Sequence, residues 1–228
     1  MTDVVGWLDE YAWGAFVILR VFLVGALLTV VFGLIGAAAR LAGGLPGRLA
    51  GMYVTFFRGT PELLVLLLFY FGSAVTLTSI ARMIDPSARF VDIPPFWAGS
   101  LALALIAGAY ATESFRGAFL GVERGQIDAA QSLGLNAWQV FLLVRFPQAW
   151  RIALPAFGNH MISLVKDTAL VSVIGLNEIM FTAKMATSVT DKPFTMFAVV
   201  AVIYLAFTTV LTKGFRRLEA QASRHLVR

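Results

Sequence analysis

The sequence predicts an all-α integral membrane protein with about five transmembrane helices. Of its 228 residues, 59% are apolar and only 14% are charged, whereas soluble domains carry about 25% charged residues. The apolar residues gather in blocks long enough to cross bilayer hydrocarbon, which takes roughly 20 residues as a helix. None of these blocks alternates between apolar and polar residues, as a membrane β-strand does. Both observations favour helical spans.

Five apolar segments carry this prediction, and together they form a single transmembrane domain over residues 1–228. They are residues 21–39, which begin a turn or two earlier, and residues 63–81, 96–112, 152–176 and 194–212. Gly33 and Gly36 mark a face of the first span on which another helix can pack closely. Thr60-Pro61-Glu62 predicts the start of the second span, with a capping hydroxyl and an acid at the positive end of the helix dipole. Residues 52–57 predict an additional helical or interfacial piece, and whether residues 49–58 enter the membrane stays open.

The basic residues predict the orientation, because cytoplasmic connections retain Lys and Arg. If the first connection is cytoplasmic, one side of the membrane holds twelve basic residues and the other side five. The N-terminus is then outside and the C-terminus inside. Trp7, Trp13 and Trp97 suit an aromatic belt at the outer surface. The twelve inner residues are Arg40, Arg48, Arg58, Arg116, Arg124, Arg145, Arg151, Lys213, Arg216, Arg217, Arg224 and Arg228.

The longest inner connection, about residues 117–150, predicts two short helices. Gly134 suits the left-handed position that ends the first helix. Asn136 can cap the second, and Gln139 can return the bond as a capping box. Pro147 is expected to restart the chain towards the fourth span. The result is a compact helical turn that presents Ala129 and Ala130 beside an acid.

This connection resembles the conserved loop of ABC importer permeases, which reads Glu-Ala-Ala, three residues, Gly, nine residues, Ile-x-Leu-Pro. Here it reads Asp128-Ala129-Ala130, three residues, Gly134, nine residues, Val144-x-Phe146-Pro147. The spacing matches throughout, and the three departures are conservative. The resemblance implies a type I importer permease whose loop docks on a cytoplasmic ATPase. The residues it implies for this coupling are Asp128, Ala129, Ala130, Leu133, Gly134, Phe146 and Pro147.

Other stretches resemble the polar amino-acid branch of that family, closest to permeases for histidine, arginine, lysine, ornithine or opines. They are residues 53–61, 109–117 and 166–172. The resemblance implies a bacterial inner-membrane subunit that works by alternating access. Its implied partners are two phosphate-loop ATPase subunits that use ATP and Mg, a soluble amino-acid-binding protein, and a second permease, with a paralogue favoured over a second copy. The chain itself is expected to bind no cofactor and no nucleic acid.

Several polar residues in or near the spans are candidates for the substrate pathway. Lys166 and Asp167 lie within the fourth span, where charges are costly unless they face protein or water; a structural ion pair is the alternative. Thr168 and Ser172 belong to the same stretch. Glu113 can contact a cationic substrate or pair with Arg116. His160 is read either as a packed core histidine or as a ligand or proton relay.

The absence of several catalytic and metal-binding motifs limits the alternative functions. The sequence has no Gly-x4-Gly-Lys-[Ser/Thr] loop, no His-Glu-x2-His and no Gly-x-Ser-x-Gly, so neither ATP hydrolysis nor hydrolase chemistry is expected of it. Without cysteine and with two histidines, it predicts no metal site. A self-contained secondary transporter or channel is one alternative, although five spans do not divide into the repeats of many transporters. A membrane scaffold without transport is the other.

Overall fold

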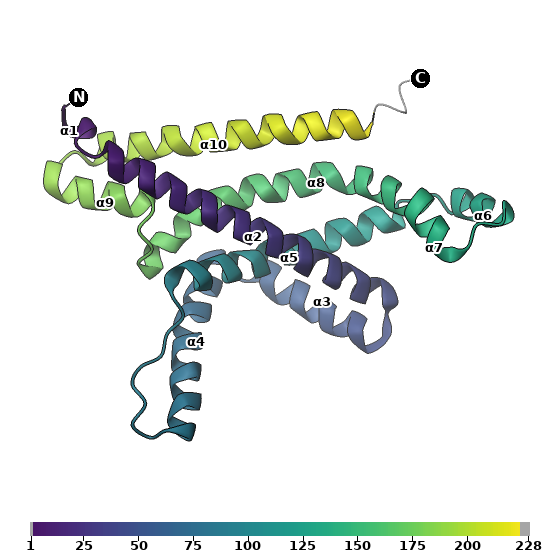
Figure 1. The fold of residues 1–228 in the computed structure, drawn as a ribbon, viewed down its shortest axis with the longest axis horizontal. Helices are drawn as coiled ribbons and strands as arrows, with labels where there is room; N and C mark the ends of the chain where they lie inside the picture. Colours follow the sequence, from purple (N-terminus) through teal and green to yellow (C-terminus); the bar gives the residue numbers. More distant parts are fainter. Residues whose placement is uncertain (1, 224–228) are drawn as a thin grey trace.

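Helices make up nearly all of the computed structural model, which describes residues 2–223 (Figure 1). Arg224 and Arg228, counted above among the inner basic residues, lie outside the described residues. The helices are α1 (Thr2–Val5), α2 (Leu8–Ala42), α3 (Gly44–Gly59), α4 (Glu62–Ile84), α5 (Pro95–Leu120), α6 (Arg124–Ser132), α7 (Ala137–Val140), the π-helix η1 (Phe141–Arg145), α8 (Phe146–Asp167), the 3-10 helix η2 (Thr168–Ile174), α9 (Ile179–Thr190) and α10 (Pro193–Ala222).

Among residues 2–223, four helices are long and apolar enough to cross a membrane: α2, α4, α5 and α10. The stretches 137–174 and 179–190, bent by 52°, form a fifth candidate if they are counted as one span. All five predicted apolar segments therefore lie in helical structure, except for the last two residues of the fourth. The fourth is the irregular one, because its α-helix gives way to a 3-10 helix at Thr168.

Two features near the helix ends differ from expectation. Thr60 does not cap α4; its hydroxyl donates to the carbonyl of Phe56 at 2.8 Å, at the end of α3. Helix α9 was not predicted, because twelve residues with several hydroxyl groups are too short and too polar to read as a span. Glu178, which is buried, caps the start of α9. Its carboxylate accepts from the backbone N–H groups of Met180 and Phe181, both at 2.9 Å.

Helix α5 lies at the centre of the packing, and α2, α4 and α8 all pack against it. The approach of α2 depends on small residues. A Cβ added at Gly33 would lie 2.8 Å from the Cβ of Ala111, and one at Gly36 would collide with Thr112. The predicted packing face of α2 is thus confirmed. The additional helical piece predicted over residues 52–57 is longer than expected, because α3 covers all of residues 49–58.

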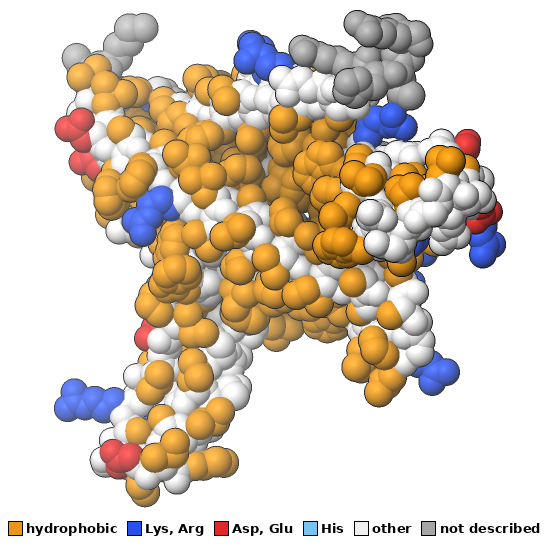
Figure 2. All heavy atoms as spheres, turned by 45° about the vertical axis from the view of Figure 1, so that its right-hand side comes forward, with side chains coloured by type: hydrophobic (Ala, Val, Ile, Leu, Met, Phe, Trp, Pro, Cys, Tyr) orange, Lys and Arg blue, Asp and Glu red, His pale blue; other side chains and the backbone are white. Residues whose placement is uncertain are grey.

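Several connections gather at two ends of the bundle, whereas the α4–α5 connection lies at the free end of α4 (Figure 1). One end holds α6, α7, the α2–α3 turn and the C-terminal end of α10; the other holds α1 and α9. Helix α4 leaves the bundle and projects to one side. Apolar side chains cover the broad middle of the surface, whereas the charged ones lie mainly at its extremities (Figure 2). This distribution suits a protein whose middle faces hydrocarbon.

Candidate functional site

The α6–α7 turn has the geometry that its sequence predicts. Gly134 has φ of +84°, the left-handed conformation that favours glycine. Its N–H donates to the carbonyl of Gln131 at 2.9 Å, and the N–H of Leu135 donates to that of Ala130 at 3.2 Å. These two bonds form a Schellman motif. The first short helix therefore ends where expected.

A capping box fixes the start of α7. The Asn136 side chain accepts from the N–H of Gln139, and the Gln139 side chain accepts from that of Asn136, both at 3.0 Å. The prediction that Pro147 restarts the chain is wrong, because α7, η1 and α8 form one helical run from Ala137 to Asp167. Proline cannot donate a backbone bond, and the wider π-helical turn just before Pro147 lets the helix pass through it.

The coupling residues named above occupy an exposed projection at one end of the molecule (Figure 1). Asp128 and Ala129 are exposed on α6, whereas Ala130 is buried against the rest of the connection. Leu133 is 81% exposed. Phe146 and Pro147 are exposed at the start of α8. The exposed surface of this connection therefore includes Asp128, Ala129 and Leu133.

A cavity of about 300 Å³ lies between α4, α5 and α8. Its lining includes two carboxylates, Glu62 from α4 and Asp167 from α8, and contains no Lys or Arg. Sequence reasoning picked out Asp167 and weighed His160 as a possible ligand, but it missed the rest of this set: Glu62 was read as a helix-start acid, and Tyr110 and Ser163 carried no separate signal. The lining residues are Glu62, Ile106, Ala107, Tyr110, His160, Ser163 and Asp167.

The chain is similar to known membrane transport proteins. Residues 29–224 match the family described as the inner membrane component of binding-protein-dependent transport systems. This chain belongs to that family. It is 41% identical to the nopaline transport system permease protein NocQ of Agrobacterium fabrum, over 96% of this chain and 93% of that one. It is 40% identical to the histidine/lysine/arginine/ornithine transport system permease protein HisQ of Escherichia coli, over 86% of each.

Solved structures agree with this family. A crystal structure of an amino acid ABC transporter with histidines has a chain that is 31% identical, with a TM-score of 0.81 and coverage of 96% of this permease and 97% of that chain. The MetNI methionine ABC transporter, at 19% identity and a TM-score of 0.71, shares the fold. The permease is therefore a multi-pass component of a bacterial inner membrane, and ATP is used by a separate subunit. The secondary-transporter and scaffold readings are set aside.

The other residues predicted for the substrate pathway lie outside the cavity between α4, α5 and α8, the central cavity of the permease. The Glu113 carboxylate is paired twice, with Arg40 at 3.2 Å and with Arg116 at 2.6 Å. Lys166 is exposed. The Thr168 hydroxyl donates to the carbonyl of Val165, and the Ser172 hydroxyl donates to that of Ala169. Of the five candidates, Asp167 alone lines the cavity.

His160 takes part in both a packing contact and the cavity wall. Its Nε2 lies 2.8 Å from the hydroxyl oxygen of Ser114, and its ring centroid lies 5.8 Å from that of Tyr110. Arg58 lies just behind, with Cζ 5.2 Å from the centroid of the Tyr110 ring. The Tyr110 ring is therefore in contact with both a histidine and a guanidinium.

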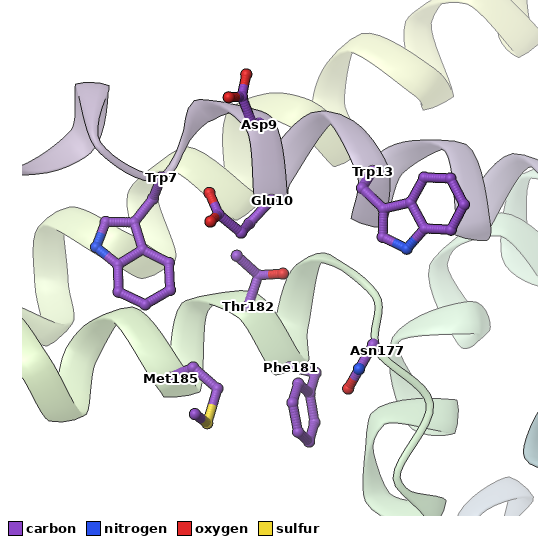
Figure 3. A pocket seen from close by; sticks show the side chains of 8 residues that line it. All are labelled: Trp7, Asp9, Glu10, Trp13, Asn177, Phe181, Thr182 and Met185. Carbon is purple, nitrogen blue, oxygen red and sulfur yellow. The ribbon is translucent and has the colours of Figure 1, made fainter.

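A second cavity, of about 400 Å³, lies at the end of the permease that holds α1 and α9. Figure 3 shows the Glu10 carboxylate pointing into it between the indoles of Trp7 and Trp13, while Asp9 points away. Helix α9 forms the facing wall with Phe181, among others. A carboxylate between aromatic rings favours a cationic group.

Proposed function

We propose that this permease imports basic amino acids or opines across the bacterial inner membrane by alternating access, and that the central cavity is part of the substrate path. The observation that carries the proposal is the pair of carboxylates, Glu62 and Asp167, in a cavity whose lining has no Lys or Arg. Charges within membrane spans are expensive, and they mark transport pathways when they face a cavity. Relatives named for nopaline and for histidine, lysine, arginine and ornithine support the same class of substrate.

The cavity chemistry suits an amino acid with a cationic side chain. The guanidinium or ammonium of the substrate would bind Asp167 and Glu62 through charge-assisted hydrogen bonds, beside the face of Tyr110. Arg58, stacked on the same ring, offers a positive charge for the substrate carboxylate. Glu10, between Trp7 and Trp13 in the second cavity, provides a similar cation-favouring surface on the delivery side.

Coupling to ATP would pass through the α6–α7 connection. Asp128, Ala129 and Leu133 form the surface that binds the ATPase, and Gly134 fixes the turn behind it. The run from Ala137 to Asp167 is helical throughout, so it joins the docking surface to an acid of the cavity. A displacement of α7 would therefore shift Asp167 without a flexible link between them.

The orientation we propose places the N-terminus outside and the C-terminus inside. Arg40, Arg116 and Arg145 belong to helix ends or connections at the α6–α7 end, as do Arg48, Arg124, Lys213, Arg216 and Arg217, and positive residues stay on the cytoplasmic side. Two ATPase subunits dock at that end, and a binding protein delivers substrate at the other. We further propose a paralogous permease as the second membrane subunit, because the chain is similar to permease proteins of opine and basic amino-acid transport systems.

The test is uptake by the reconstituted transporter, assembled from this chain, its partner permease, the ATPase and the binding protein. Labelled arginine, lysine, histidine and glutamate are offered one at a time with ATP inside the vesicles. We expect import of the cationic substrates, and no import with an inactive ATPase. Import of glutamate in preference to arginine, or arginine uptake without ATP hydrolysis, would overturn the proposal.

A further inference from the structure

A second functional feature lies where the π-helix meets α2 and α5. A cavity of about 270 Å³ opens there, with one charged residue in its lining. Leu34, Ala38 and Leu41 form a stripe along the exposed side of α2, and Phe119 and Phe141 form the opposite wall. The charged residue is Arg145, the last residue of η1. The cavity therefore has an apolar wall on a membrane-spanning helix and a cationic group on the other side.

Arg145 lacks a counter-ion in the part of the chain that the structure describes. Its Nε is buried and has no hydrogen-bond partner, and neither salt bridge among residues 2–223 involves it. Its guanidinium lies against the ring of Phe119, with 5.8 Å from Cζ to the ring centroid. A buried guanidinium donor without an acceptor is costly. The arrangement therefore calls for an anion from outside this chain.

We propose that this cavity binds an anionic glycerophospholipid, with its phosphate on the Arg145 guanidinium and an acyl chain along Leu34, Ala38 and Leu41. Guanidinium groups bind phosphate through paired N–H donors, and basic pockets between membrane helices are known sites for acidic headgroups. The stripe on α2 has the spacing of one helix face and belongs to a predicted span. A lipid is the ligand that brings a phosphate and a long apolar chain together at this depth.

The position of the site gives the lipid a structural consequence. Arg145 ends the π-helical turn that joins α7 to α8, and the Phe141 ring stacks on both Phe119 and Trp138, with centroids 6.1 and 5.8 Å apart. A bound lipid would fix Arg145 and Phe141 together, and so would stiffen the link between the α6–α7 connection and α8. The lipid site does not depend on which substrate the permease carries.

Native mass spectrometry of the detergent-purified assembled transporter tests the proposal, with phosphatidylglycerol and phosphatidylcholine of equal chain length as probes. We expect the wild-type complex to bind phosphatidylglycerol about fivefold more tightly than phosphatidylcholine, as one basic residue allows. Arg145→Gln should abolish this preference, and Arg145→Lys should keep part of it. Ala38→Phe fills the apolar side and should weaken both lipids. Arg48→Gln, which removes an exposed arginine outside the cavity, is the matched control.

Three outcomes would overturn the lipid assignment. One is a phosphatidylglycerol preference that is unchanged in Arg145→Gln, or an affinity for both lipids that is unchanged in Ala38→Phe, since the bound lipid would then be non-specific. Another is equal competition by inorganic phosphate, which would make the acyl chain irrelevant. The third comes from a photo-reactive amino acid at position 38 in membranes: cross-linking to the partner permease rather than to lipid would assign the cavity to the subunit interface.

Discussion

The α6–α7 connection and the central cavity use different means to hold their shape. The connection is an exposed projection that is fixed by backbone bonds: a Schellman turn at Gly134 and a capping box between Asn136 and Gln139. The cavity is formed by side chains from α4, α5 and α8, and its chemistry depends on Glu62 and Asp167. In the proposed function, one region presents a shape to the ATPase, and the other presents charge to the substrate.

This difference predicts that the two regions fail in different ways. A change in the connection should alter ATPase docking and leave substrate selectivity intact. A change in the cavity should alter selectivity and leave docking intact. Because one helical run joins them, the total rate of uptake falls in both cases. Measuring docking and selectivity separately is therefore needed to tell them apart.

The largest effect is expected for Asp167→Asn. The substitution keeps the size of the side chain and removes a charge that would bind the cationic group of the substrate. A charged hydrogen bond contributes about 1.5–3 kcal/mol, so arginine uptake should fall about 10- to 100-fold in vesicles. Co-purification of the ATPase is the control and should not change, and Asp167→Glu should retain part of the uptake. Wild-type uptake in Asp167→Asn would remove the cavity from the substrate path.

Gly134→Val should produce the next largest effect, and it acts on the connection. A β-branched residue at φ of +84° is strained by about 1–2 kcal/mol or more, so the turn behind Leu133 should distort. Uptake should fall about tenfold, with less ATPase co-purified and an unchanged ratio of arginine to lysine uptake. Gly134→Asn, which tolerates this conformation better, is the matched control. A changed substrate ratio with normal docking would contradict the separation of the two regions.

Glu113→Gln should affect stability more than transport. The carboxylate joins Arg40 on α2 to Arg116 on α5, and its loss leaves both guanidinium groups without this partner. Since the pair is partly exposed, we expect a loss of about 1–2 kcal/mol. The melting temperature of the purified complex should fall by several degrees, while the apparent affinity for arginine stays the same. An affinity change without a melting change would instead place Glu113 on the substrate path.

The sequence predicted local features well, because their causes lie within a few residues. Gly134, Asn136 and Gln139 determine their turn by backbone conformation and capping alone, and the apolar runs determine the spans. The central cavity could not be predicted in the same way. Glu62 and Asp167 are more than a hundred residues apart, and only the packing of α4 and α8 on α5 brings them to one space. Pro147 misled because the π-helical turn that accommodates it has no simple sequence signal.

The smallest effect is expected for Lys166→Met, which tests whether the substrate path is limited to the face of α8 that carries Asp167. Lys166 precedes Asp167 on the same helix, but successive residues point about 100° apart, and its exposed side chain is not part of the cavity lining. Uptake and ATPase co-purification should both stay within about twofold of wild type, a difference of less than about 0.5 kcal/mol. Loss of uptake with normal docking would mean that the path includes the Lys166 face of α8, and that this face is completed by the second permease subunit.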